Sequence, residues 1–67
     1  MDMLLITVFD INGLPIDYLT IPVDINVQDL AYYARKAIGE IVNNWDWAWV
    51  FLSDNTTTTS IGKLRND

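Results

Sequence analysis

The sequence predicts an α+β domain of two layers, in which one helix packs on a small mixed β-sheet in the order β-β-α-β with an optional last strand. Three features predict it: a β-branched opening segment that ends in an Asn-Gly turn, one helical apolar stripe, and an alternating tryptophan segment. We expect a single domain over residues 1–67, because a chain this short has room for one hydrophobic core.

A β-hairpin opens the chain. Residues 3–11 are rich in apolar and β-branched residues, and Asp10-Ile11-Asn12-Gly13 then supplies a turn in which Asn and Gly tolerate positive φ. The second strand is predicted over residues 14–23. Pro15 and Pro22 place it at the edge of the sheet, because proline has no N–H to donate to a neighbouring strand.

A helix is predicted from Val27, with Asn26 as its N-cap and Asp29 near the positive end of its dipole. Its apolar stripe has helical spacing and consists of Val27, Leu30, Ala31, Ala34, Ala37, Ile38, Ile41 and Val42. Asn43-Asn44 is expected to end it, since asparagine tolerates the left-handed conformation found there.

Residues 45–52 alternate in the manner of a strand, with the three tryptophans on one face and Ala48, Val50 and Leu52 on the other. We expect the tryptophans to pack against the small helix residues, because Asp46 shares the other face and prefers water. The long connection through the helix favours pairing parallel to the first strand. The threonine run through Ile61 is a candidate fourth strand, and residues 62–67 are predicted to be a flexible basic tail.

A hairpin followed by an Asp-capped helix resembles the opening of ubiquitin-like β-grasp domains, over about residues 1–44. The resemblance implies a loosely β-grasp-like layout. The glycine pair through which ubiquitin-like modifiers are conjugated is missing from Leu64-Arg65-Asn66-Asp67, so the family's function is not expected here.

Composition narrows the function classes. The net charge is −5, and residues 1–34 carry all of it, so we expect a neutral or basic protein partner, no direct binding of nucleic acid and no membrane association. Cysteine and histidine are missing, which removes the commonest metal ligands and general base. We therefore expect no enzyme, no cofactor and no metal. The sequence shows no signal peptide or membrane-spanning run, so we also expect a cytoplasmic protein.

Two candidate surfaces follow. The first is an acidic display with one exposed aromatic residue, made of Asp10, Asp17, Asp24, Asp29 and Tyr32. The alternative is that these are turn and cap residues: Asp10 suits the start of the hairpin turn and Asp24 precedes the helix cap, so local roles explain them without a partner. A base-stacking use of the tryptophans would need a basic groove, which an acidic chain does not favour.

The second candidate is an apolar sheet face for self-association, made of Leu5, Phe9, Val50 and Leu52. A homodimer would bury it, unless the threonine segment folds across it.

These features predict a non-catalytic protein-binding module. By analogy of size and acidity it is a phage-type inhibitor or regulator (anti-defence, anti-restriction or anti-CRISPR-like) of a host nucleic-acid-binding protein, which would place it in the host cytoplasm. The alternative is a homo-oligomeric structural or assembly subunit that associates through its sheet face.

Overall fold

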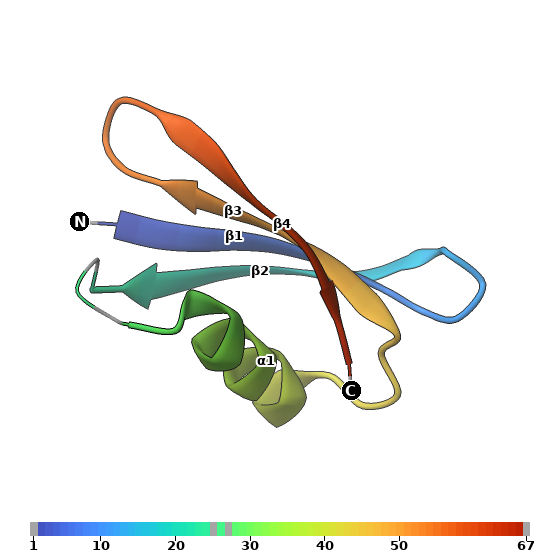
Figure 1. The fold of residues 1–67 in the computed structure, drawn as a ribbon. Coiled ribbons are helices and arrows are strands. Elements are labelled where there is room, and N and C mark those ends of the chain that lie inside the picture. The colour runs from blue at the N-terminus through green and yellow to red at the C-terminus, as the bar shows by residue number, and fades with distance from the viewer. Residues whose placement is uncertain (1, 25, 27, 67) are drawn as a thin grey trace.

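The fold is one helix packed on a four-stranded β-sheet, in a computed structural model that describes residues 2–24, 26 and 28–66 (Figure 1). The elements are β1 (Asp2–Phe9), β2 (Pro15–Val23), α1 (Leu30–Ile41), β3 (Trp47–Ser53) and β4 (Thr58–Arg65). This confirms the predicted α+β class and the optional fourth strand. Within the described residues, no helix has the length and apolar character needed to cross a membrane.

The sheet has the strand order β2-β1-β3-β4, and every neighbouring pair is antiparallel. The expectation of a mixed sheet with β3 parallel to β1 is therefore wrong. A long helical connection fixes the relative direction of the two strands that it joins, which here are β2 and β3. These two strands do run the same way, but β1 lies between them and is antiparallel to both.

The first hairpin forms as predicted. Gly13 has a φ of 80°, and the Asp10 carboxylate accepts hydrogen bonds from the backbone N–H groups of Asn12 at 2.8 Å and Leu14 at 3.0 Å. β2 lies at the sheet edge, where Pro15 and Pro22 need not donate to a further strand.

The helix starts later than the sequence predicted. Val27, its predicted first residue, lies outside the described residues, and Asn26 occupies a turn. Asp29 is the N-cap instead, and its carboxylate accepts the backbone N–H of Tyr32 at 3.0 Å. After the helix, Asn44 adopts the left-handed conformation (φ 59°) that was expected of the asparagine pair.

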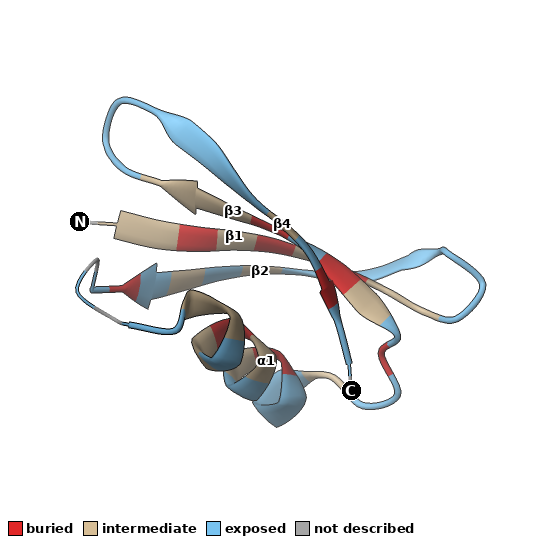
Figure 2. Ribbon diagram, viewed as in Figure 1, coloured by how far each residue is buried: buried red, intermediate tan, exposed pale blue. Residues whose placement is uncertain are grey.

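The hydrophobic core lies between α1 and one face of the sheet (Figure 2). It consists of Leu4, Ile6, Val8, Val23, Ala34, Ile38, Trp45, Ala48, Val50 and Leu64. The prediction that Trp47 and Trp49 face the helix is thus wrong. Ala48 and Val50 are the buried set of β3, and Trp49 keeps 40% of its surface exposed.

The reversal has a local cause. Asp46 and Trp45 precede β3, so strand alternation does not fix which way their side chains lie. Trp45 is buried, whereas Asp46 is exposed and bridges two segments through its backbone: its N–H donates to Phe9 and its carbonyl accepts from Asn66. The water preference of Asp46 therefore says nothing about the orientation of Ala48 and Val50.

Residues 62–65 belong to β4 and are not a flexible tail. Leu64 is a core residue, paired in register with Ala48. Asn66 continues the attachment, because its side-chain amide donates to the Trp45 carbonyl at 2.8 Å. The threonine run lies in the β3–β4 turn and at the start of β4, at the sheet edge, and so does not fold across the open face.

We expect lysine at position 50 to be far more damaging than lysine at position 5. Val50→Lys puts an ammonium group into the core and should lower the free energy of unfolding by more than about 3 kcal/mol. That is a large share of the about 3–10 kcal/mol available to a chain of this length. Leu5→Lys, on the half-buried opposite face, should lower it by less than about 1.5 kcal/mol. Urea denaturation measures both, and equal losses would contradict the assignment of the faces.

The carboxyl group of Asp54, in the β3–β4 turn, should titrate at unusually low pH. The Asp54 carboxylate accepts the backbone N–H groups of Thr56 and Thr57, each at 2.7 Å, and these bonds lower the pKa of Asp54 from 3.8 to about 2. Because the folded pKa is the lower one, the stabilisation is complete above pH 3.8 and is lost as the pH falls through about 2. A carbon NMR titration of the carboxyl group tests this; a midpoint near 3.8 would contradict the turn geometry.

Candidate functional site

The sheet face opposite the helix carries a group of aromatic side chains, which we call the aromatic face: Phe9, Trp47, Trp49 and Phe51. The register brings them together, because Phe9 of β1 lies opposite Trp47 of β3 and Leu5 lies opposite Phe51. Successive residues of a strand point to opposite faces, so burying Ala48 and Val50 sends Trp47, Trp49 and Phe51 to this side. α1 lies on the other side of the sheet (Figure 1).

The rings are packed in a defined order. Phe9 and Trp47 stack with ring centroids 4.0 Å apart and an interplanar angle of 9°. Trp47 and Trp49 meet edge to face, at 5.8 Å and 82°. The ring quadrupoles favour the edge-to-face contact, and the Phe9–Trp47 stack adds a close contact between rings, so the aromatic face is an ordered surface and not a set of independent side chains.

Two cations border these rings. Lys63 of β4 pairs in register with Trp49, and its Nζ lies 4.4 Å from the ring centroid of Trp47, a cation–π distance. Arg65 pairs in register with Trp47 and so belongs to the same face. Of the four basic residues in the chain, two therefore lie beside the aromatic face.

The described acids lie elsewhere. Within the strands the acids are Asp2 and Asp17, which pair with the core residues Val23 and Val8 and so belong to the helix side of the sheet. The other described acids are in turns, loops or the helix: Asp10, Asp24, Asp29, Glu40, Asp46 and Asp54. A chain with a net charge of −5 thus presents an aromatic surface edged by positive charge.

The structure divides the predicted self-association face. Leu5 and Phe9 do lie on the open side of the sheet. Val50 and Leu52 do not, because they pair with the core residues Ile6 and Leu4. The error follows directly from the reversed orientation of β3, since each strand contributes one alternate set of residues to each face.

The predicted acidic surface is not one cluster. Asp10 and Asp24 each accept a backbone N–H two residues on, Asp17 accepts that of Tyr18, and Asp29 caps α1. These hydrogen bonds account for the four aspartates as turn, strand and cap residues.

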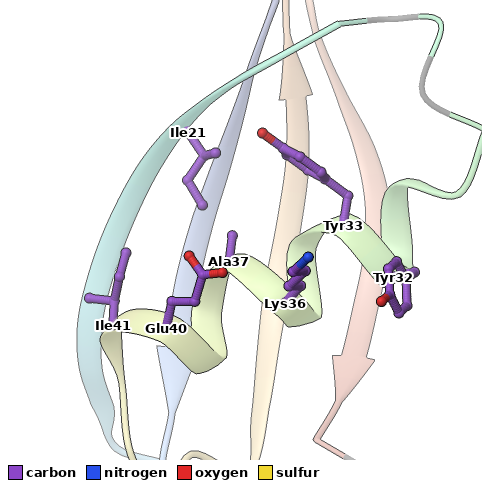
Figure 3. A pocket seen from close by; sticks show the side chains of 7 residues that line it. All are labelled: Ile21, Tyr32, Tyr33, Lys36, Ala37, Glu40 and Ile41. Carbon is purple, nitrogen blue, oxygen red and sulfur yellow. The ribbon is translucent and has the colours of Figure 1, made fainter.

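Tyr32 lies apart from the aromatic face, on α1, with 62% of its surface exposed. It borders an open hollow of about 480 Å³ between α1 and β2 (Figure 3). Ile21 and Tyr33 form the side of this hollow towards β2, and the Tyr33 hydroxyl donates to the Pro22 carbonyl at 3.0 Å. Lys36 and Glu40 are its charged lining residues.

The tip of the β1–β2 hairpin is a second apolar surface. Ile11 is 82% exposed and Leu14 60% exposed, and the hairpin extends beyond the rest of the sheet (Figure 1). Exposed apolar side chains this close together are typical of contact surfaces.

Comparisons with known proteins add no relative. No family model matches the chain, a search of curated proteins finds no similar sequence, and a search of solved structures finds no similar fold. Among the described residues there is also no group of three or more acidic, histidine or cysteine side chains placed to hold a metal ion.

Sequence reasoning missed Trp47 and Trp49 as surface residues, and it placed Lys63 in a flexible tail and not in a strand beside them. A signal for Lys63 was present: Gly62-Lys63-Leu64-Arg65 alternates, which is typical of a strand with Leu64 inside and both cations outside. Read as a strand, these residues would have brought positive charge next to the tryptophans.

The stacked rings should stabilise each other. In a double-mutant cycle of Phe9→Leu and Trp47→Leu, we expect a coupling free energy of about 0.5–1.5 kcal/mol, the usual range for an aromatic pair. Urea denaturation of the four proteins measures it. Additive losses would show that the two rings do not interact in solution.

Proposed function

We propose that this protein is a non-catalytic binding module whose aromatic face receives a macromolecular partner. One observation carries the proposal: an ordered aromatic surface lies on the sheet face that α1 leaves uncovered. Tryptophan and arginine are enriched among the residues that dominate binding energy, and this face has both. Exposed apolar surface of this extent usually marks an association site.

The more specific hypothesis of an acidic inhibitor receives less support from the geometry. Asp10, Asp17, Asp24 and Asp29 keep their negative charge, but each accepts a backbone N–H, so turn, strand and cap roles explain them without a basic partner. We therefore base the proposal on the aromatic face.

Homo-oligomerisation through the uncovered sheet face and the apolar hairpin tip is the second candidate. Four strands about 4.8 Å apart and about seven residues long give a face of about 450 Å², so two copies would bury about 900 Å² in total. That is slightly below the about 1,000 Å² expected of a specific interface. The apolar hairpin tip, with Ile11 and Leu14, would add to it.

Sedimentation equilibrium at high micromolar concentration separates the two functions. We expect a mass of 7.7 kDa, the single chain, with the aromatic face free for a foreign partner. A mass of twice that value, returned to the single-chain value by Leu5→Lys, would reject the proposal in favour of the homo-oligomer. Asp24→Lys is the control, because it adds a lysine in the loop after β2, away from the aromatic face.

A further inference from the structure

We propose that the ligand of the aromatic face is single-stranded nucleic acid, whose bases stack on the rings of β3 while its phosphates follow the cations of β4. This inference rests on the proposed function. It reverses the expectation from composition, which excluded nucleic acid because the chain is acidic.

The rings and the cations form two adjacent rows. Trp47, Trp49 and Phe51 follow one another along β3 at about 6.7 Å, the distance between every second residue of a strand. Lys63 and Arg65 lie one strand away, about 4.8 Å to the side, and pair in register with Trp49 and Trp47. A row of rings beside a row of positive charge is what a single strand requires, because each of its nucleotides has a flat base and a phosphate.

Among the rings of β3, Trp49 is the best placed for stacking. Trp47 is already in contact with Phe9 on one side and with Lys63 through a cation–π contact. Trp49 meets Trp47 only edge to face, and 40% of its surface is exposed. Trp47 therefore holds Lys63 and Trp49 in place, and Trp49 offers the ring surface.

Charge favours a nucleic acid over a second copy of this chain. A second copy would present the same face, on which the strands place Lys63 and Arg65 but none of the described acids. Lys63 and Arg65 would therefore meet no carboxylate from the described strands of the second copy. The nearest described acid along the chain is Asp46, directly before Trp47, which limits the positive charge at one end of the row.

Two cations predict a shallow dependence on salt. For single strands, the logarithm of the association constant falls with the logarithm of the salt concentration by about 0.7 per phosphate contact. Contacts from Lys63 and Arg65 together predict a slope of about −1.4. Most of the affinity should then come from stacking, which is largely independent of base sequence.

Fluorescence anisotropy with labelled oligo(dT) and oligo(U) of about ten nucleotides, titrated between about 50 and 200 mM salt, tests the proposal. Trp49→Ala should weaken binding by about 5- to 150-fold, the usual effect of removing one stacking ring, and Trp49→Phe should restore most of it. Tyr32→Ala is the matched control, because it removes an exposed ring from α1. Lys63→Gln should bring the slope to about −0.7, whereas Lys36→Gln, on the helix, should leave it unchanged.

Thermal unfolding shows whether each variant is folded. If Trp49→Ala is unfolded, the salt slope measured with Lys63→Gln still decides the question. Polyglutamate of equal length supplies charge without rings, and an alternating Glu-Tyr peptide supplies both. Polyglutamate that binds as well as oligo(dT), or a Glu-Tyr peptide that binds more tightly, would overturn the inference in favour of simple charge binding or a protein partner. A monomeric protein that binds neither oligonucleotide would overturn this inference alone, whereas a dimer would reject the proposed function itself.

Discussion

A single helix can cover only one face of a four-stranded sheet, and the rest of the structure depends on this constraint. α1 has 12 residues and is about 18 Å long, enough to cover one face of the sheet and no more. The core between the helix and this face includes two small side chains, Ala34 of α1 and Ala48 of β3, which are completely buried. Along each strand, the side chains that alternate with the core residues must therefore lie on the opposite face of the sheet, which α1 does not cover.

Strand alternation turns that constraint into a surface. With Ala48 and Val50 in the core, Trp47 and Trp49 have to point the other way. The antiparallel register then sets Phe9 on one side of Trp47 and the cations of β4 on the other side. One packing choice, made at the helix, thus determines which chemical groups meet on the far side of the sheet.

Features that depend on neighbouring residues were predictable from the sequence. The Asp10–Gly13 turn, the edge position of β2 and the left-handed Asn44 all follow from the conformational preferences of a few adjacent side chains. The orientation of β3 does not, because both alternate sets of its residues are apolar and hydrophobicity alone cannot rank them. Asp46 seemed to decide the question, but it lies one residue before the strand begins.

The aromatic face was missed for a related reason. It needs β4 to continue through Arg65, and Leu64 is the one apolar residue among the last five of the chain. Its burial depends on contacts with the core across the sheet, and Asn66 adds hydrogen bonds to the loop before β3. The alternation of Gly62-Lys63-Leu64-Arg65 is a local signal for a strand, but four residues alone do not decide between a paired and a solvated segment.

Several acidic residues of the chain have structural roles, so its net charge does not by itself indicate what it binds. Asp10, Asp24, Asp29 and Asp54 accept backbone N–H groups in turns or at the helix cap, where a short carboxylate is the favoured side chain. These roles place negative charge at the ends of the elements. At physiological ionic strength, charges interact over about 8 Å, so a ligand on the sheet responds mainly to the cations beside it. For the proposed ligand, the total charge would therefore govern approach from a distance, and the local arrangement of Lys63 and Arg65 would govern contact.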